Sequence, residues 1–143
     1  TDEAVALTLL YTRKIMDAAS QKFFAGREVT EAEFAALMIL YDYRKKPLKQ
    51  AEIAGMLLVT RLSARDVLNR LERKRLIEPA PHADLRARAL KITELGKRTL
   101  RSVRGDYYRM LADGLHGLSE PQKEALLDTH SALRGSLLDG LGG

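Results

Sequence analysis

Residues 48–74 read LKQAEIAGMLLVTRLSARDVLNRLERK, a pattern that indicates two short helices. Its first part predicts a short helix from about residue 49 to 56 or 57, and Thr60 is a good N-cap for a second helix after a tight turn. The second helix carries an apolar stripe at helical spacing, formed by Ala64, Val67 or Leu68, and Leu71. Two short helices joined by a tight turn, the second apolar inside and basic outside, are typical of a helix-turn-helix.

The chain that follows predicts a β-hairpin. Ile77–Pro79 is a short extended run, and a proline-containing basic loop separates it from Arg88–Ile92. Apolar and basic residues alternate, although imperfectly, along Arg88–Ile92, which favours a strand over a helix. Two strands around a basic loop, directly after a helix-turn-helix, predict a winged helix.

Helices are expected on both sides of this region. Residues 4–24 are largely apolar, contain neither Gly nor Pro and show helical spacing. Three further helix starts have capping residues: Thr30 with Glu33, Thr93, and Ser119 with Gln122. The predicted fold class is therefore mainly α with a small β-hairpin wing.

The positive charge is concentrated in one segment. The chain of 143 residues has a net charge of +5. Residues 61–91 hold nine Lys or Arg against four Asp or Glu, whereas residues 1–60 and 92–143 are each neutral. A solvated helix face usually mixes both signs, so this cluster favours a surface that binds a polyanion. A merely solvated patch is the alternative.

Composition excludes several classes of protein and site. The chain has no Cys, so it has no disulfide, no thiolate zinc site and no cysteine redox switch. The histidines, His82, His116 and His130, are scattered, and we expect neither a metal nor a cofactor. No apolar run approaches the roughly 18 residues of a membrane span and no secretory leader is present, so we expect a cytoplasmic protein with no membrane partner. The sequence leaves open whether residues precede Thr1.

Residues 29–97 resemble the MarR family of bacterial winged-helix transcriptional regulators. The resemblance rests on LKQAEIAGML, on the apolar frame of VTRLSARDVLNRLERKRLI, and on Asp84-x-Arg86 followed by ITELGK. The chain departs from the family pattern at three positions. Arg75 stands where the family usually has Gly, Lys49 where a Thr or Ser cap is usual, and Leu62 where small polar residues are common.

The resemblance implies a sequence-specific regulator of double-stranded DNA, and repression as a homodimer on a pseudo-palindromic operator is the outcome we expect. We divide the one compact domain into an N-terminal dimerisation helix (1–28), a winged helix-turn-helix DNA-binding region (29–93) and C-terminal dimerisation helices (94–143). The flanking helices carry more apolar positions than the winged helix needs for its core, which favours an obligate homodimer. That these helices complete a monomeric core is the alternative.

The expected DNA-binding residues lie on the two predicted helices and on the wing: Gln50, Thr60, Arg61, Leu62, Ser63, Arg65, Asn69, Arg70, Arg73, Lys74, Asp84, Arg86 and Arg88. Residues near the N-terminus of a recognition helix usually reach deepest into the major groove. We therefore expect base or near-base contacts from Arg61, Ser63 and Arg65, and contact of Leu62 with a thymine methyl. Side chains nearer the C-terminus, Asn69, Arg70, Arg73 and Lys74, are expected to contact phosphates or to be merely solvated.

The wing has its own expected role. By resemblance, Arg86 enters the minor groove while Asp84 steers it or braces the loop, since arginine in a narrow groove senses negative potential and shape. A local surface ion pair between Asp84 and Arg86, worth little, is the alternative. Arg88 is expected beside Arg86 as a phosphate contact.

A small aromatic or phenolic acid is the expected effector. The aromatic and cationic candidates for its pocket are Tyr11, Arg13, Phe23, Phe24, Tyr41, Tyr107 and Tyr108. Aromatic residues at helical spacing also form ordinary core, and that alternative stays open.

Three other functions compete with the regulator. An enzyme is disfavoured because the sequence has no Gly-rich phosphate loop, no nucleophile with a base and no paired carboxylates. A winged helix that binds another protein need not be basic on its wing and second helix. Sequence-independent binding to DNA or RNA is distinguished by comparing specific with scrambled duplexes at two salt concentrations.

Overall fold

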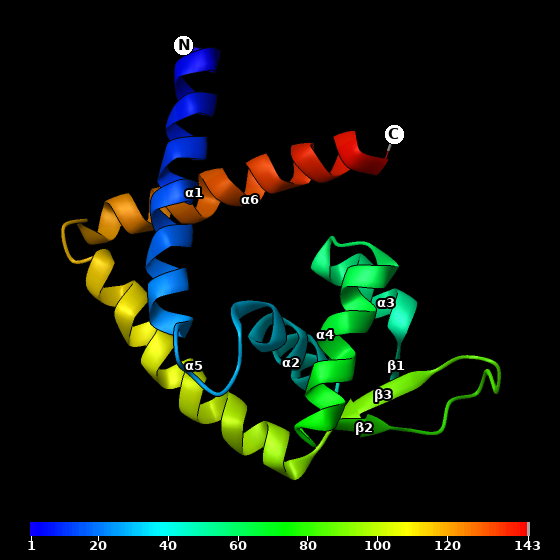
Figure 1. The fold of residues 1–143 in the computed structure, drawn as a ribbon. Coiled ribbons are helices and arrows are strands. Elements are labelled where there is room, and N and C mark those ends of the chain that lie inside the picture. Colours follow the sequence, from blue (N-terminus) through cyan, green and yellow to red (C-terminus); the bar gives the residue numbers. More distant parts are fainter. Residues whose placement is uncertain (143) are drawn as a thin grey trace. The chain divides into compact units, whose positions relative to one another are not determined.

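The computed structural model describes residues 1–142 (Figure 1). In order, the elements are α1 (Asp2–Phe24), α2 (Glu31–Asp42), β1 (Leu48–Lys49), α3 (Gln50–Leu57), α4 (Arg61–Arg73), β2 (Ile77–Pro79), β3 (Ala89–Ile92), α5 (Glu94–Gly114) and α6 (Glu120–Gly142). The chain divides into two compact units, residues 1–104 and the part from Gly105 onward. Helix α5 continues from the first unit into the second.

The predicted capping box begins α2. The backbone N–H of Glu33 donates to Thr30 Oγ1 at 3.2 Å, and the backbone N–H of Thr30 donates to Glu33 Oε2 at 3.3 Å. Val29, just before the cap, is buried, as is Phe34, whose ring centroid lies 5.5 Å from that of Phe24 in α1. This aromatic contact joins the end of α1 to the start of α2 within the first unit.

Helices α3 and α4 form the predicted helix-turn-helix. The turn passes through Leu58 in the left-handed region at φ 55°, and Thr60 then caps α4 by accepting a hydrogen bond from the Ser63 N–H at 3.1 Å. The buried stripe of α4 is the predicted one: Ala64, Val67, Leu68 and Leu71. It packs into a core whose fully buried side chains include Leu37, Leu40, Ile53, Leu90 and Leu100.

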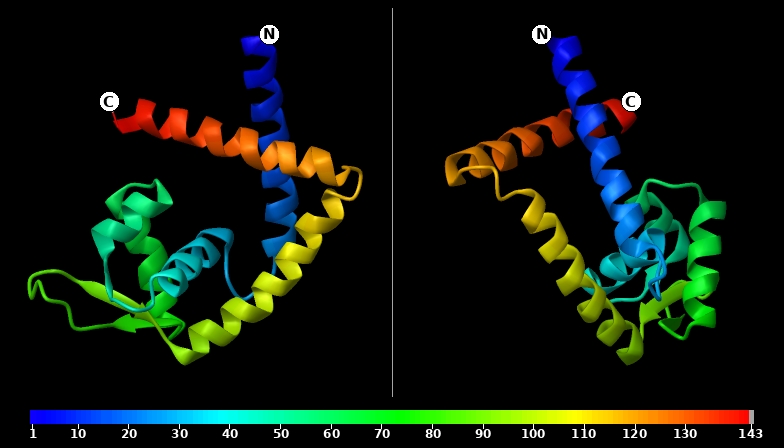
Figure 2. Two further views of the ribbon diagram at one scale, coloured as in Figure 1. Left: turned by 180° about the vertical axis from the view of Figure 1, so that it is seen from behind. Right: turned by 60° about the vertical axis from the view of Figure 1, so that its left-hand side comes forward.

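The sheet has three strands rather than the two predicted. Its order is β1-β3-β2, both pairs are antiparallel, and Leu48 lies opposite Leu90 in the added pair. Strand β1 contains only two residues, so no alternation of apolar and polar residues could predict it from the sequence. The strand expected at Arg88–Ile92 begins one residue later, at Ala89. Figure 2 shows the loop between β2 and β3 extending away from α2 and α4 as the wing.

Helix α4 ends in the left-handed turn that glycine usually makes, although the residue here is Arg75. Its φ is 60°, and the backbone N–H groups of Arg75 and Leu76 donate to Glu72 O and Leu71 O at 2.9 and 3.0 Å. These two bonds are the Schellman pattern, which satisfies carbonyls at the helix end. The left-handed turn therefore forms although a non-glycine residue is strained in this conformation.

Thr93 precedes α5 and caps it, as predicted: its Oγ1 accepts a hydrogen bond from the Gly96 N–H at 3.0 Å. Packing explains why position 96 is a glycine, although the sequence alone does not reveal this. A Cβ at this position would lie 2.1 Å from the carbonyl oxygen of Leu76. Only glycine allows the backbone of α5 to approach the turn after α4 this closely.

Two long helices expose apolar side chains. On α1 these are Val5, Leu7, Leu10, Tyr11, Ile15 and Met16, and on α6 they are Leu126, Leu127, Leu137, Leu138 and Leu141. No described residue of α6 is buried, although its predicted cap is present, with the Ser119 N–H donating to Gln122 Oε1 at 2.9 Å. The structure thus leaves both helices with unpartnered apolar surface.

Candidate nucleic-acid interface

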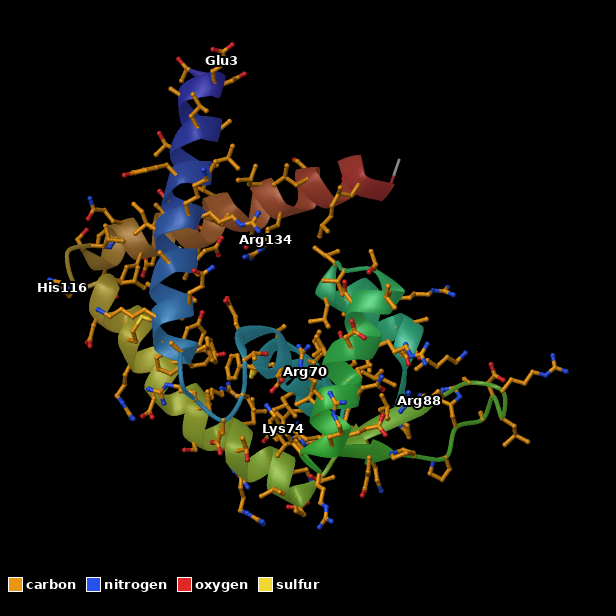
Figure 3. All side chains as sticks on the ribbon, in the orientation of Figure 1. Glu3, Arg70, Lys74, Arg88, His116 and Arg134 are labelled. Carbon is orange, nitrogen blue, oxygen red and sulfur yellow. The ribbon has the colours of Figure 1, made fainter. Side chains whose placement is uncertain are left out.

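A buried carboxylate binds two of the expected DNA contacts. Glu33 is completely buried, and its two carboxylate oxygens accept hydrogen bonds from Arg70 Nε at 3.0 Å and Lys74 Nζ at 2.6 Å. Lys74 also donates to the backbone oxygen of Glu28 at 2.8 Å. The two cations, labelled in Figure 3, thereby join the C-terminal half of α4 to the start of α2. Arg70 and Lys74 therefore help to hold α4 against α2.

Two more cations of the basic segment face acidic partners. Arg88 donates through Nη2 to Glu72 and through Nη1 to Asn69 Oδ1 at 3.4 Å, so it connects the wing to α4. Lys91 Nζ lies 3.4 Å from Glu78 Oε1 on the neighbouring strand. Glu72 and Asn69 thus hold the Arg88 guanidinium against α4, and its expected contact with a phosphate stays a prediction.

The remaining cations of residues 61–91 have no acidic partner among residues 1–142: Arg61, Arg65, Arg73, Arg75 and Arg86. All five are exposed. Four of them lie on α4 or at its C-terminal turn, and the fifth lies in the wing loop. The basic surface is thus smaller than the sequence count suggests, but it keeps the two elements, the second helix of the motif and the wing, on which it was predicted.

The first turn of α4 has two hydroxyls occupied by capping. Thr60 Oγ1 accepts from the Ser63 backbone and donates to Ser63 Oγ at 3.0 Å. The neighbouring side chains of Arg61, Leu62 and Arg65 are exposed. Gln50, expected as a contact from the first helix, is half-buried at the start of α3, and its backbone N–H donates to Arg88 O at 3.1 Å. Of the expected base-reading residues, Arg61, Leu62 and Arg65 are the ones whose side chains face solvent unengaged.

The wing loop is organised around Asp84. Its Oδ1 accepts from the Arg86 backbone N–H at 3.1 Å, and its Oδ2 lies 3.5 Å from Lys49 Nζ at the start of α3. His82 Nδ1 accepts from the Asp84 N–H at 3.0 Å. The hydrogen bond from the Arg86 backbone, with a smaller contribution from Lys49, lowers the pKa of Asp84 below its ordinary value of 3.8. The carboxylate is therefore charged throughout the neutral range.

Sequence reasoning missed Lys49 as a partner of the wing. It was noted only because it cannot cap α3, and its side chain indeed makes no capping bond, while its backbone N–H donates to Glu52 Oε1 at 3.0 Å. The pairing with Asp84 spans 35 residues of sequence, so no local pattern reveals it.

The expected effector residues do not gather at one place within the first unit. Tyr11 and Arg13 share a hollow of about 470 Å³ along α1, where Arg13 also pairs with Asp17 at 3.6 Å. Phe23 lies under the Arg27 guanidinium, 3.8 Å from its ring centroid, and Phe24 belongs to the core. Tyr41 lies under Arg44 at 4.2 Å. Tyr107 and Tyr108 belong to the second unit, where their ring centroids are 6.3 Å apart.

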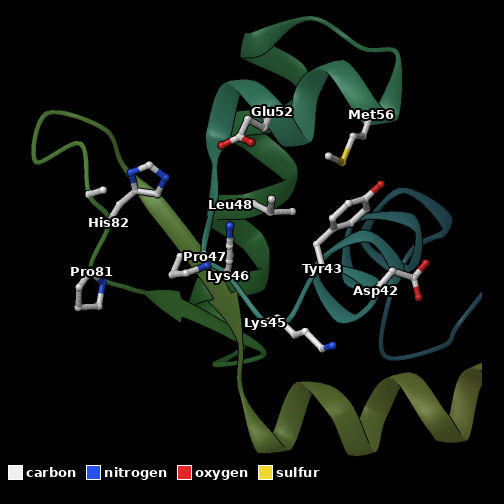
Figure 4. Close-up of a pocket in the computed structure, with 11 residues that line it drawn as sticks. Asp42, Tyr43, Lys45, Lys46, Pro47, Leu48, Glu52, Met56, Pro81 and His82 are labelled. Atoms are coloured by element: carbon white, nitrogen blue, oxygen red, sulfur yellow. The ribbon is translucent and has the colours of Figure 1, made fainter.

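A larger hollow of about 700 Å³ lies between the end of α2, β1, α3 and the wing (Figure 4). It is lined by Asp42, Tyr43, Lys45, Lys46, Pro47, Leu48, Glu52, Met56, Pro81, His82 and Ala83. Its charged side chains are of both signs, and they do not define one kind of ligand.

Residues 1–142 contain neither a metal-ligand cluster nor a membrane-spanning helix. No group of three or more metal-ligating side chains occurs in this part of the chain. None of its helices combines the length and the apolar character that crossing a membrane requires.

The fold and the basic surface define a winged helix-turn-helix protein. No protein-family model matches the chain. The chain is 26% identical to the HTH-type transcriptional repressor YetL of Bacillus subtilis over 119 residues. The matched residues cover 82% of this chain and 71% of YetL. The likeness therefore extends beyond the helix-turn-helix itself.

Solved structures give the same result for the fold. A variant of Staphylococcus aureus MepR is 25% identical, with a TM-score of 0.71 over 93% of this chain and 97% of that chain. MepR in a complex with DNA is 24% identical, with a TM-score of 0.74 over 92% and 94%. The MarR family transcription regulator SP03579 is 22% identical, with a TM-score of 0.77 over 99% and 92%.

These likenesses confirm the predicted resemblance to MarR-family winged helix-turn-helix regulators, and with it the predicted fold class. YetL is named a transcriptional repressor and SP03579 a transcription regulator, in line with the expectation that this chain is not an enzyme.

Proposed function

We propose that this protein is a transcriptional repressor that binds a pseudo-palindromic operator as a homodimer in the bacterial cytoplasm. The observation that carries the proposal is the set of five arginines on α4, its C-terminal turn and the wing that have no acidic partner among the described residues. Lys and Arg contacts with phosphates supply most of the affinity for DNA, and such contacts need cations that are not already neutralised. MepR, with a similar fold, has been solved with DNA, which supports the same use of the fold here.

Each element has a separate task in this proposal. Helix α4 enters the major groove with its N-terminal turn, where Arg61 and Arg65 contact base edges or nearby phosphates. Arg73 and Arg75, at the other end of α4, contact phosphates. Arg86 enters the minor groove from the wing, which Asp84 braces. Arg70, Lys74 and Arg88 hold α4 and the wing in place through their ion pairs.

The homodimer is supported by the exposed apolar surface of α1 and α6. Leu7 on α1 is 67% exposed, and Leu127 and Leu141 on α6 are 68% and 73% exposed. Apolar side chains in continuous helical arrays mark an interface more often than scattered single ones do. A two-fold dimer places two recognition helices about one DNA turn apart and predicts a matching symmetry in the operator.

Selection of bound sequences from a random duplex pool tests the function. The proposal expects an enriched, pseudo-palindromic site whose affinity exceeds that of a scrambled duplex at two salt concentrations, and a protein mass near twice 16.0 kDa by sedimentation. Equal affinity for both duplexes would leave only sequence-independent binding. No binding to either duplex, with the dimer intact, would favour a protein-interaction module instead.

An aromatic or phenolic acid effector is the second part of the proposal. Its support is the α1 hollow that both Tyr11 and Arg13 line, where an aromatic ring could meet Tyr11 and a ligand carboxylate would replace Asp17 as the partner of Arg13. Titration with phenolic acids should lower operator affinity, and Arg13→Gln should weaken that response. A response that is absent in the unaltered protein would remove the effector and leave the repressor proposal standing.

A further inference from the structure

Leu62 is the one exposed apolar side chain of α4. It is 69% exposed, and every other exposed or half-buried residue of the helix is polar or charged: Arg61, Ser63, Arg65, Asp66, Asn69, Arg70, Glu72 and Arg73. The apolar residues Ala64, Val67, Leu68 and Leu71 are all buried. Leu62 is therefore not part of the core of the described residues, and its side chain is available for a contact outside them.

The position of Leu62 is set by helix geometry. At about 100° per residue, Leu62 lies nearly opposite the centre of the buried stripe, in line with Asp66, Asn69 and Arg73. It is also the second residue of α4, in the first turn after the Thr60 cap. Of the side chains on the outward line of this helix, Leu62 is the one nearest the N-terminus, the end that approaches base edges.

The neighbours of Leu62 restrict its partner. Arg61 and Arg65 are also exposed in the first turns of α4, and neither has an acidic partner within residues 1–142. Two guanidinium groups without acidic partners in the described part of the chain, close to a lone exposed leucine, favour a partner that is anionic and offers a small apolar group. A duplex meets both requirements, because it is anionic and presents one apolar group in its major groove, the C5 methyl of thymine.

We propose that Leu62 is a specificity-determining residue that contacts the C5 methyl group of a thymine in each operator half-site. The inference rests on the proposed function and adds to it the identity of one base and the atom by which that base is read. Its partner is a methyl group rather than a hydrogen-bonding edge, so thymine should be distinguished from uracil, which differs only in that methyl.

Replacement of thymine by deoxyuridine tests this contact directly. In the operator selected from the random pool, each thymine is replaced singly by deoxyuridine, which leaves every hydrogen-bonding group in place. The full-length protein should lose about fourfold in affinity at one symmetry-related pair of positions, the effect of burying one methyl-sized group. Other thymines should respond less.

Two variants assign the effect to its side chain. Leu62→Ser should bind the thymine operator more weakly by a similar factor, bind the deoxyuridine operator as the unaltered protein does, and melt at the same temperature. Leu58→Asn is the matched control, because Leu58 is a similarly exposed leucine, 70% exposed, in the turn before α4, and it should keep the discrimination.

The outcomes separate this inference from the function on which it rests. Specific binding without any thymine–deoxyuridine difference would overturn the role of Leu62 and leave the repressor proposal intact. Discrimination that persists in Leu62→Ser, or disappears in Leu58→Asn, would assign the methyl contact to another residue and also overturn it. Failure to select any specific duplex would overturn both proposals together.

Discussion

Asp84 accepts a hydrogen bond from the backbone of Arg86 and not from its guanidinium group. The Asp84 Oδ1 lies 3.1 Å from the Arg86 backbone nitrogen, while Asp84 Oδ2 pairs with Lys49. The carboxylate thus shapes the wing turn without neutralising the arginine that the turn presents. The alternative predicted from sequence, a local ion pair between the two side chains, is not formed.

Arg86→Ala tests what the presented guanidinium does. We expect operator affinity to fall by about tenfold to a hundredfold and the salt dependence of binding to weaken by about one phosphate contact. The melting temperature and the dimer should not change, because the side chain has no acidic partner within residues 1–142. Unchanged affinity would mean that the wing does not reach DNA.

The acid response of the wing follows from the lowered pKa of Asp84. Because the folded-state pKa lies below the ordinary 3.8, the interactions of this carboxylate stabilise the wing fully above that value and are lost as pH falls through the folded pKa. An NMR titration of the Asp84 carboxyl carbon should therefore show a midpoint below 3.8, and Lys49→Met should raise it. A midpoint at or above 3.8 in the unaltered protein would mean that the bracing contacts do not persist in solution.

Glu33 should be important for stability even though no DNA contact is proposed for it. Glu33→Ala removes the acceptor that Arg70 and Lys74 share, and we expect the free energy of unfolding to fall by about 2–3 kcal/mol. Breaking a fully buried ion pair would cost more, but here both cations are partly exposed to solvent. Glu31→Ala, on the same turn of α2 but exposed, should change stability by about 0.5 kcal/mol or less. Urea unfolding of both variants makes the comparison, and equal effects would contradict the role given to Glu33.

Gly96→Ala and Gly105→Ala should act in opposite directions, although both glycines lie inside α5. At Gly96 the added methyl meets the Leu76 carbonyl, and we expect destabilisation of about 1–3 kcal/mol. At Gly105 the nearest atom lies 3.9 Å away, so the helix propensity of alanine should stabilise the protein by up to about 1 kcal/mol. Thermal melting measures both, and stabilisation by Gly96→Ala would show that α5 and the turn after α4 are not this close.

The sequence predicts the winged helix because its determinants are local. Caps at Thr30, Thr60 and Thr93 and the apolar stripe of α4 are visible within single turns. The pairing of the basic residues is not local: Glu33 is 37 residues from Arg70 and 41 from Lys74. A count of charges therefore locates the basic surface correctly but overstates the number of cations free to bind DNA.

The left-handed turn at Arg75 allows a gain in stability to be separated from an effect on binding. Arg75→Gly relieves the strain of a non-glycine residue at φ 60° and should stabilise the protein by about 1 kcal/mol. Arg73→Gly, two residues earlier at the last helical residue of α4, should destabilise it by up to about 1 kcal/mol, because glycine has a lower helix propensity than arginine. Both substitutions remove one exposed guanidinium, so both should weaken DNA binding by a similar factor at low salt. Opposite shifts in melting temperature with parallel losses in affinity are the expected result, and a lower melting temperature for Arg75→Gly would contradict the strained turn.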